Sequence, residues 1–366
     1  MKFSVSQSAL AKAITVVSKG LGNSTLDILG GIYINASEGT VEFQTTDLNI
    51  SIRHRVAANV EEAGAVVISG KVLSNIVKNL PDAAVTFERD GHNVHITCQK
   101  SSYLLHSFDA SEFPDFPTFD LTSSVELPVD VLSSMVTKLY KVVARDTSRP
   151  MLSGIYTTVQ DNKILMVATD TYRLAVCDTS AETSTLEGSF ESIIPGAIFH
   201  DVLSLPTDTG TILLGVTNNQ IVFVSGNTTL VTRKLDGSFP DHTKIIPQSC
   251  ICSVNLSVGA FEDALKRVCV IATAGSNVRI DVDVDAQTMR LSTTDANLGE
   301  ADETISVEAT GESFSSVFNH HYVSDCITAV KDEETVTFEV ENHDRPGVFK
   351  SYAKTNYLYL LMPVRV

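Results

Sequence analysis

The feature that most constrains the fold of this chain is a short motif that recurs at a long and regular interval. Thr46-Asp47, Thr169-Asp170 and Thr294-Asp295 share this motif, and their Asp residues lie 123 and 125 residues apart. Two other motifs keep this register: Phe113-Pro114-Asp115 with Phe239-Pro240-Asp241, and Gly31-Ile32-Tyr33 with Gly154-Ile155-Tyr156. The interval is far longer than the repeat of a solenoid, so each copy is expected to be a domain. A length of 366 residues also exceeds what one hydrophobic core usually organises.

The order of predicted elements repeats with the motifs. Each copy reads as an amphipathic helix, two or three strands, a second helix and further strands, as the helical spacing of Leu10, Ile14 and Val17 and the apolar run 335–340 illustrate. The predicted helices cover residues 7–19, 70–80, 130–145, 196–205, 259–273 and 319–331. We therefore predict an α+β fold of three tandem similar domains, each with two helices on antiparallel sheet, at residues 1–121, 125–247 and 253–366.

Composition narrows the class of protein. A hydrophobic content of 43% is that of an ordinary globular chain. The opening MKFSVSQSALAKA has no apolar run long enough for a secretion signal, and no eighteen consecutive apolar residues occur, so a cytoplasmic location is expected. The six cysteines include one C-x-C, at Cys250 and Cys252, without the second ligand pair of a zinc site. We expect reduced, mostly buried thiols and neither a metal nor a cofactor.

Charge is distributed unevenly along the chain. The net charge of −17 argues at first against nucleic acid. Basic residues nevertheless occur on predicted helices at intervals of seven residues, which places both members of a pair on one helix face. The pairs are Lys12 with Lys19, Lys71 with Lys78, and Lys138 with Arg145, and Lys141 lies between the last two. Later helices are weaker, because Lys266 and Arg267 are offset by Glu262 and Asp263.

This pattern predicts a particular kind of DNA contact. No signature of base stacking or sequence readout accompanies the basic residues, so contact would be made with the phosphate backbone alone. Contact through a few lysines is weak and salt-sensitive. It suits a protein that topological enclosure keeps on its polymer. For each pair taken singly, an ordinary solvated helix face remains the alternative.

The residues also resemble a known family. The segments MKFSVSQSALAKAI, TLDILGGIYINA, RDTSRPMLSGI, ATDTYRLAV, KLDGSFPDHTKIIP and YLLMPVRV are similar, in this order and over the whole chain, to the bacterial DNA sliding clamp, the beta subunit of DNA polymerase III. The resemblance implies a homodimer that closes head to tail into a six-domain ring, with helices lining the hole. It implies a processivity factor without catalytic activity that encircles duplex DNA regardless of sequence and tethers the polymerase, the clamp loader and repair proteins.

The resemblance also implies a groove that binds a short peptide of these partners. Its first half is expected at Leu152, Thr169, Thr171, Tyr172, Arg173 and Leu174. Its second half is expected at Pro240, Lys244, Ile245, Pro346, Leu360, Leu361, Met362, Pro363, Val364, Arg365 and Val366. The residues themselves favour the tail: Pro363 cannot donate a ladder hydrogen bond, so apolar side chains should remain near the surface. A final strand buried in its own core is the alternative.

The sequence departs from the common enterobacterial pattern at three groove positions. Tyr172, Thr171 and Lys244 replace His, Gly and Arg.

For the dimer, the family pattern places an edge strand around Lys100 and Tyr103 against Val270, Ile271, Glu300 and Asp302. For DNA it indicates the loop from Gly22 through Asn23 to Ser24, Lys71, and the segment from Arg145 to Arg149.

Two other classes of protein are alternatives. An enzyme would need a site such as Asp170, Tyr172 and Arg173, or His320-His321 beside Asp325. The Thr-Asp pair, however, recurs at the same register in all three repeats, which favours an Asp that caps a turn. Adjacent histidines on a helix also point about 100 degrees apart, and no catalytic motif occurs. A DNA-independent repeat scaffold for protein interactions shares the groove and differs only in ignoring the basic helices.

Overall fold

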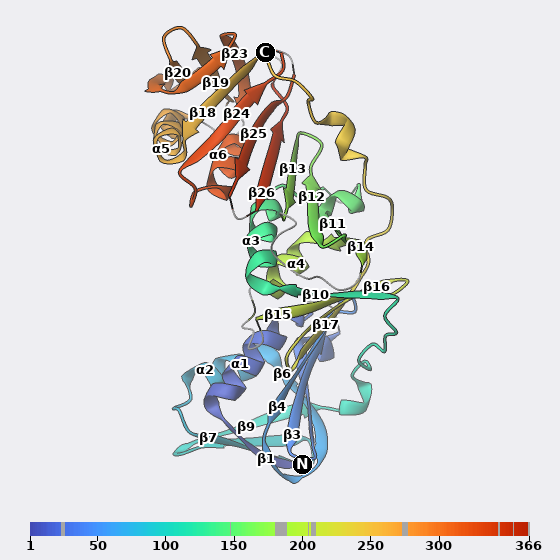
Figure 1. Cartoon of the computed structure of the whole chain (residues 1–366). Coiled ribbons are helices and arrows are strands. Elements are labelled where there is room, and N and C mark those ends of the chain that lie inside the picture. Colours follow the sequence, from blue (N-terminus) through green and yellow to red (C-terminus); the bar gives the residue numbers. More distant parts are fainter. Residues whose placement is uncertain are drawn as a thin grey trace. The chain divides into compact units, whose positions relative to one another are not determined.

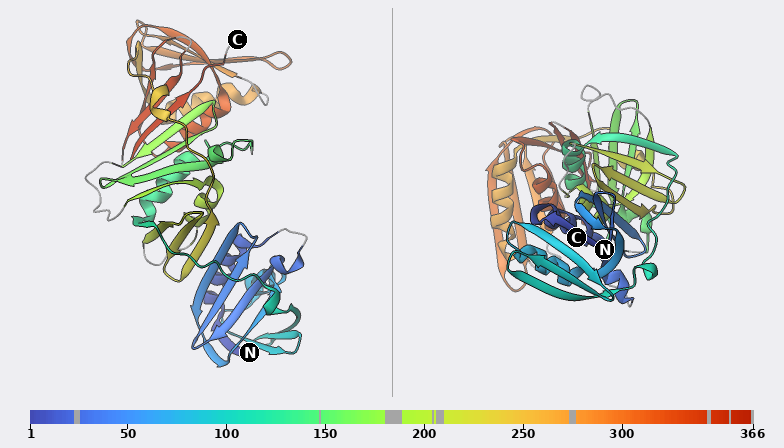
Figure 2. Two further views of the ribbon diagram at one scale, coloured as in Figure 1. Left: turned by 90° about the vertical axis from the view of Figure 1, so that its right-hand side faces the viewer. Right: turned by 90° about the horizontal axis from the view of Figure 1, so that it is seen from below.

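The sheets of this protein run from one repeat into the next. The computed structural model describes residues 1–22, 26–146, 148–179, 189–203, 205, 210–272, 277–342, 345–353 and 355–364. This part of the chain divides into two compact units, Met1–Val129 with Asp201–Lys234, and Asp130–His200 with Leu235–Val366. The second repeat contributes to both units. Compactness therefore follows the continuous sheets and not the limits of the repeats (Figures 1 and 2).

The first repeat supplies most of the first unit. Its elements are β1 (Lys2–Ser6), α1 (Gln7–Val17), β2 (Gly31–Ser37), β3 (Thr40–Thr46), β4 (Ile50–Ala57), β5 (Asn59–Glu62), β6 (Gly64–Ser69), α2 (Gly70–Asn79), β7 (Ala84–Asp90), β8 (Asn93–Cys98) and β9 (Ser101–Phe108). Short 3-10 turns lie at Ser18–Gly20, Asp27–Gly30 and Ala110–Glu112. Leu10, Ile14 and Val17 are buried as their spacing predicted.

The second repeat has the same order of elements, except that no strand in its described residues corresponds to β5. Its elements are β10 (Ser123–Pro128), α3 (Val129–Tyr140), β11 (Gly154–Gln160), β12 (Lys163–Thr169), β13 (Arg173–Asp178), β14 (Phe190–Pro195), α4 (Gly196–Leu203), β15 (Thr211–Val216), β16 (Gln220–Ser225) and β17 (Thr228–Arg233). The 3-10 turn η4 (Pro150–Ser153) lies between α3 and β11, and the 3-10 turn η5 (His242–Ile245) follows β17.

The third repeat lies entirely in the second unit. Its elements are β18 (Cys252–Ser257), α5 (Val258–Val268), β19 (Asn277–Asp283), β20 (Thr288–Asp295), β21 (Gly299–Ser306), β22 (Glu308–Gly311), β23 (Phe314–Asn319), α6 (His320–Ala329), β24 (Thr335–Val340), β25 (Gly347–Tyr352) and β26 (Asn356–Leu361), with a 3-10 turn at Cys269–Ile271.

Three antiparallel sheets hold these elements together. A 13-stranded sheet in the first unit has the order β10-β15-β16-β17-β4-β3-β2-β6-β9-β8-β7-β1-β5. In the second unit, a 9-stranded sheet has the order β14-β11-β12-β13-β26-β25-β24-β18-β22, and a 4-stranded sheet has the order β21-β20-β19-β23. Repeats are therefore joined edge to edge, by β17 on β4 and by β26 on β13. The second junction is visible as the green strands beside the red ones (Figures 1 and 2).

The repeated motifs have structural roles. Asp47 Oδ1 accepts hydrogen bonds from the backbone N–H of Asn49 and Ile50. Asp170 and Asp295 each accept two such bonds in the same way, from Tyr172 and Arg173 and from Asn297 and Leu298. The prediction of a turn-capping Asp is confirmed.

The other two motifs pair with each other. The ring of Phe113 stacks on Tyr33 at 5.4 Å between centroids, and that of Phe239 stacks on Tyr156 at 5.2 Å. In each of the first two repeats, the segment that follows the last strand therefore packs against a strand of the same repeat. Phe113 packs on β2 and Phe239 packs on β11.

Two helix predictions extended too far: α5 ends at Val268, where residues 259–273 were predicted, and α3 also ends early. α3 ends at Tyr140, five residues before Arg145. Lys138 and Arg145 are consequently not two turns apart on one helix face, and Lys141 also lies beyond the helix. The apolar Val142 and Val143 extend the helical pattern in the sequence, but Ala144 N donates to Leu152 O, so the chain there bonds to the turn η4 instead.

Candidate functional site

A set of apolar side chains covers one face of the 9-stranded sheet where β13 meets β26. Four buried residues form its floor, Val167, Leu174, Val348 and Leu360. Partly buried apolar residues pack around them: Tyr156, Leu165, Val176, Phe239, Ile246 and Leu358. We call these ten residues the apolar cluster. Because side chains alternate along a strand, Met166 and Ala168 turn to the opposite, core face.

The equivalent surface of the first repeat is polar. The strands align residue by residue at an offset of 123, since Tyr33 pairs with Gln44 and Gln44 with Arg53, as Tyr156 pairs with Val167 and Val167 with Val176. Five positions can be compared in this way. Tyr156, Leu165, Val167, Leu174 and Val176 correspond to Tyr33, Glu42, Gln44, Ser51 and Arg53. The same backbone therefore carries an apolar surface in one repeat and a charged one in the other.

The third repeat is polar at these positions too. Val167 pairs with Val176 as Ser292 pairs with Asp302, and Thr169 pairs with Leu174 as Thr294 pairs with Glu300. Of the three equivalent surfaces, the one at β13 and β26 is alone in being apolar. Removal of such side chains from water by a ligand is favourable, at about 25 cal/mol per Å² of apolar surface.

Large apolar side chains stay exposed at the ends of this surface. Tyr172 is 63% exposed, Ile245 51% and Met362 44%. Met362 N donates to Tyr172 O at 3.0 Å, so these two lie together just beyond the paired parts of β13 and β26. Val364 N donates to Val317 O at 2.7 Å, which ties the tail to β23. Lys244 is exposed and forms an ion pair with Asp241 at 3.0 Å, and Pro240 is exposed beside it.

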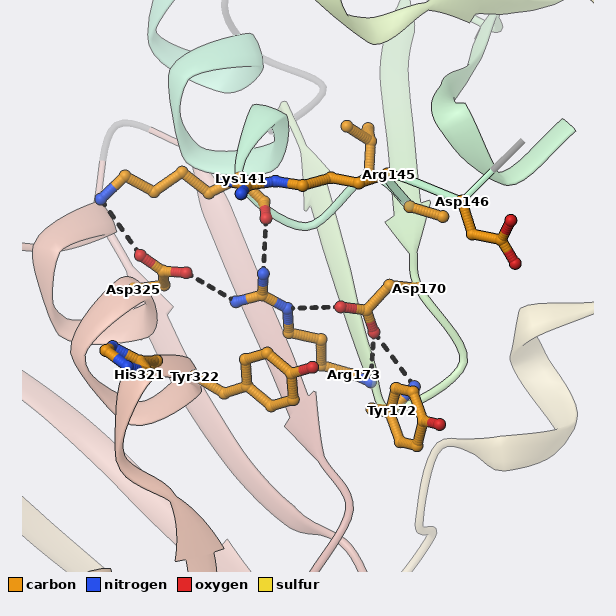
Figure 3. A pocket seen from close by; sticks show the side chains of 11 residues that line it. Lys141, Arg145, Asp146, Asp170, Tyr172, Arg173, His321, Tyr322 and Asp325 are labelled. Carbon is orange, nitrogen blue, oxygen red and sulfur yellow. Dashed lines mark hydrogen bonds and ion pairs between the residues drawn. The ribbon is translucent and has the colours of Figure 1, made fainter. Parts of the chain in front are cut away.

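Arg173 lies on the opposite face of β13 from Leu174, in a polar network (Figure 3). Its guanidinium, 7% exposed, bonds Asp170 at 2.9 Å, Asp325 at 2.8 Å and the carbonyl oxygen of Lys141 at 2.5 Å. It also donates to the hydroxyl of Tyr359 at 3.1 Å and stacks over the ring of Tyr322 at 4.2 Å. These contacts join the second repeat to α6 and β26 of the third.

A cavity of about 580 Å³ opens beside this network. Lys141, Arg145, Asp146, Tyr172 and His321 belong to its lining, and Lys141 pairs with Asp325 at 3.2 Å (Figure 3).

The electrostatics of this network are those of a structural tie. Burial alone would lower the pKa of Arg173, but the contacts with Tyr359, Asp325 and Asp170 raise it overall. Burial raises the pKa of Tyr359 and of Tyr322. Arg173 is thus a permanently charged side chain, held in place by its ion pairs and hydrogen bonds. In the part of the chain that the structure describes, no group of three or more His, Cys, Asp or Glu side chains could hold a metal ion.

The expected groove residues occupy several different positions. Leu174 and Leu360 belong to the floor of the apolar cluster, and Tyr172, Ile245 and Met362 are exposed at its ends. Leu152 and Leu361 are buried and lie outside the cluster. Thr169 and Thr171 shape the turn before β13, where Thr169 Oγ1 donates to Arg173 O. Pro346, Pro363 and Val364 are half-buried, and Arg365 and Val366 lie outside the described residues. Arg173 was also expected at the groove; alternation along β13 places its guanidinium on the face opposite the apolar cluster, where Arg173 lines the cavity together with Tyr172.

Sequence reasoning missed most of the apolar cluster. Leu165, Val167 and Val176 lie in runs that are apolar at every position, so nothing in them marks one face as a binding surface. Comparison with Glu42, Gln44 and Arg53 of the first repeat is the signal that could have revealed them.

The expected DNA-facing residues are not alike. Lys71 and Lys78 are exposed on α2, Lys12 is half-buried on α1, and Lys19 pairs with Asp201 at 3.2 Å. Arg145 and Arg149 are exposed in the segment after α3. Lys266 pairs with Glu262 and Arg267 with Glu303. Asn23 and Ser24 lie outside the described residues.

Lys138 was expected to face DNA, but its side chain does not face solvent. Its side chain is 11% exposed and donates to Glu333 at 3.0 Å, over the ring of Tyr357. An ammonium group held in this way is not available to DNA.

The residues expected at a dimer contact lie on or beside unpaired strand edges. β9 pairs with β8 along Ser101–His106 and reaches β6 only at Ser107 and Phe108. β21, which carries Glu300 and Asp302, pairs only with β20 and ends its sheet. Lys100 and Tyr103 lie at the start of β9, and Val270, beside the half-buried Ile271, is 80% exposed.

Three tandem α+β repeats, each with two helices on antiparallel sheet and joined edge to edge, define the clamp fold. Models of the N-terminal, central and C-terminal domains of the DNA polymerase III beta subunit match residues 1–117, 126–241 and 243–365. The chain belongs to the DNA polymerase III beta subunit family.

Individual relatives agree with this assignment. The chain is 26% identical to the beta sliding clamp of Bacillus subtilis over 378 residues, which covers 100% of both chains. The crystal structure of the DNA polymerase sliding clamp from Bacillus subtilis matches with a TM-score of 0.93 at 26% identity, covering 100% of this chain and 99% of that one. The sliding clamp from Caulobacter crescentus matches with a TM-score of 0.91 at 26% identity over 100% of both chains. No described helix is both long and apolar enough to cross a membrane.

Proposed function

We propose that this protein is a non-catalytic processivity factor, two copies of which close head to tail into a ring around duplex DNA in the cytoplasm. The ring tethers the replicative polymerase, the clamp loader and other partners through a short peptide that each places on the apolar cluster. The names of its relatives support this role, and within the chain the two edge-to-edge junctions carry the proposal. The domains are proposed at residues 1–121, 125–247 and 253–366.

The two junctions within the chain predict a third between chains. In each junction the last strand of one repeat pairs with the strand after the Thr-Asp turn of the repeat before it: Val231 opposes Ser51, and Leu360 opposes Leu174. The corresponding strands left over are β9 and β21. A head-to-tail contact that uses them closes after two chains and removes both exposed edges.

The same logic gives the register of the junction between chains. The hairpin pairs Cys98–Ser101 and Ser225–Thr228 are equivalent, so Leu104 corresponds to Val231, and Glu300 corresponds to Ser51 and Leu174. Leu104 of one chain should therefore oppose Glu300 of the other. Tyr103 and Val270 would supply apolar contact near this pairing.

The DNA contact is proposed for the helices of the first repeat. α1 and α2 contain no Asp or Glu, whereas the whole chain has a net charge of −17. Lys71 and Lys78 are the exposed cations of α2. Contacts of this kind bind phosphates without reading sequence.

Encirclement is tested by topology. The protein is loaded by its loader onto a nicked circular plasmid, washed in high salt, and the plasmid is then linearised. A ring stays on the circle and leaves the cut DNA by its ends. Loss from the circle in high salt would contradict the proposal, and a DNA-independent scaffold would never be retained.

Partner binding is tested on the exposed end of the apolar cluster. The probe is a fluorescein-labelled hexapeptide that ends in two large apolar residues. We expect Met362→Asp to weaken the affinity of the protein for this peptide by about tenfold or more, the equivalent of about 1.4 kcal/mol. Leu48→Asp, an equally exposed apolar residue of the first repeat, is the matched control. Equal affinity for a peptide whose apolar pair is replaced by aspartate would contradict an apolar groove.

A further inference from the structure

A second cavity lies in the first repeat, at the counterpart of the apolar cluster. It measures about 380 Å³ and is lined by Tyr33, Gln44, Phe113, Asp115 and Phe116, among others. Tyr33 and Gln44 correspond to Tyr156 and Val167 of the cluster, and Phe113 corresponds to Phe239. The repeat thus builds a hollow at the same place with different chemistry. None of these residues takes part in the function proposed above.

The walls of this cavity are aromatic and already hold one guanidinium group. The Tyr33 and Phe113 rings are stacked at 5.4 Å, and the guanidinium of Arg53 lies 4.3 Å from the centre of the Phe116 ring. Arginine stacks well on such faces because its charge is delocalised over a plane. Arg53 itself pairs with Glu42 at 3.7 Å.

The cavity is also acidic. Burial first, and then the charges of Glu42 and Asp115, raise the pKa of Tyr33, so both carboxylates act on the same wall. Glu42 is engaged by Arg53 and Arg55. Asp115 is exposed, and within the part of the chain that the structure describes no cation pairs with it at 4 Å or less. One carboxylate at the cavity is therefore open to a cationic ligand.

We propose that this cavity is a second peptide-binding site, which takes an arginine side chain of a partner protein. The guanidinium would pair with Asp115 and lie against the aromatic wall of Tyr33, Phe113 and Phe116. A carboxylate beside aromatic faces recognises this group by charge and by plane together. This site binds a basic residue, whereas the apolar cluster binds apolar ones. Two different segments of one partner can therefore bind to the two sites.

The experiment uses the full chain and small probes. Saturation-transfer NMR is recorded with N-acetyl-arginine amide, N-acetyl-leucine amide and N-acetyl-glutamate amide. We expect saturation of the arginine probe alone, with a dissociation constant on the order of millimolar. Asp115→Asn should weaken it about fivefold, in keeping with a partly exposed ion pair.

Glu112→Gln is the matched control. It removes the same charge from the same loop, but Glu112 does not line the cavity. The affinity of Glu112→Gln for the arginine probe should stay within about twofold of the parent protein, because an exposed carboxylate that does not line the cavity is screened by water and salt. Equal weakening in both variants would show diffuse attraction and overturn the site. So would equal saturation of the leucine probe, absence of arginine binding, or unchanged binding in Asp115→Asn when circular dichroism shows both variants folded. Variants of the apolar cluster leave this result untouched, so the two proposals fail separately.

Discussion

A single side chain, Arg173, fastens the second repeat to the third. Its five contacts come from the Thr-Asp turn, the segment after α3, α6 and β26. A charge buried to this degree is tolerated only because each of its neighbours pairs with it or accepts a hydrogen bond from it or stacks on it. Removing the cation would take one charged partner from Asp170 and one from Asp325, which would keep the N–H groups of the turn and Lys141, respectively.

We therefore expect Arg173→Met to destabilise the second unit by about 3 kcal/mol. The calorimetric transition of that unit should fall by roughly 6–12 °C. Arg279→Met removes an exposed arginine of the same unit that donates to Ser315, and it should leave the transition unchanged. An equal fall in both variants would show that the network carries no special weight.

The thiols offer a second test at this scale. Cys98, Cys177, Cys252 and Cys326 are buried, Cys269 is half-buried and Cys250 is exposed. Burial raises the pKa of Cys177 and of Cys269 to about 11, which leaves little reactive thiolate at pH 8.

One thiol should therefore react at once with Ellman's reagent at pH 8, and six after unfolding in guanidinium. Cys250→Ser should abolish the fast phase. Two or more fast thiols in the native parent protein would contradict the burial described here.

Sequence reasoning at the residue level succeeded where a residue type has one strong local use. An Asp two and three residues before bare N–H groups caps a turn, and Thr46-Asp47 and its copies do so. It failed where the outcome depends on a distant partner. The sequence around Lys138 does not indicate its ion pair with Glu333, 195 residues away. The sequence around Arg173 likewise does not indicate its ion pair with Asp325.

Among the elements, the helices differ in how their first turns are closed. Asn319 Oδ1 accepts from the N–H groups of His321 and Tyr322 at 2.9 and 3.3 Å at the start of α6. Ser257 occupies the same position before α5, and its side chain makes no capping bond. Helix α5 can therefore serve as the uncapped control for α6.

Asn319→Ala should destabilise the first turn of α6 by about 1 kcal/mol. Amide hydrogen exchange of that turn, followed by mass spectrometry, should become about fivefold faster. Ser257→Ala should leave exchange in α5 unchanged. A similar acceleration in both helices would show that the capping bond of Asn319 contributes nothing.

The cations of α2 set the salt dependence of the proposed DNA contact. Each phosphate neutralised contributes about 0.9 to the slope of log K against log salt. Lys71→Ala with Lys78→Ala should therefore reduce the slope for a duplex oligonucleotide by roughly 1.8. Lys163→Ala with Arg233→Ala removes two exposed cations from strands and should not change it. An unchanged slope in the α2 variant would exclude this helix from the contact.

Element order was predictable, and element ends were less so. The motif register located all six helices, because amphipathic spacing is a property of a single segment. α3 was extended too far because Val142 and Val143 keep that spacing while the backbone bonds elsewhere. The apolar cluster could not be predicted from one segment, since it is assembled from β11, β12, β13, β25, β26 and the segment that carries Phe239 and Ile246.

For the whole molecule, we propose that the oligomeric state depends on the edges of β9 and β21. Val270 is among the most exposed apolar side chains described and lies beside the residues expected at the contact between chains. An aspartate there should not disturb a folded monomer, but it would add a charge to an interface already acidic through Glu300 and Asp302.

We expect Val270→Asp to shift the protein from dimer to monomer in sedimentation velocity experiments and to abolish retention on circular plasmid. Val72→Asp, an exposed apolar residue on α2, should leave the dimer intact. A parent protein that sediments as a monomer at every concentration, or a Val270→Asp dimer as stable as the parent, would contradict the head-to-tail junction.

Joints made from main-chain hydrogen bonds place few demands on side chains. Because every residue type except proline offers the same N–H and C=O groups, the pairings of β17 with β4 and of β26 with β13 can persist while most of their amino acids are exchanged. A chain only 26% identical to a relative can then still superimpose on it with a TM-score of 0.93. Architecture is inherited through the backbone, which leaves the outward-facing positions at each joint open to evolve separate binding preferences.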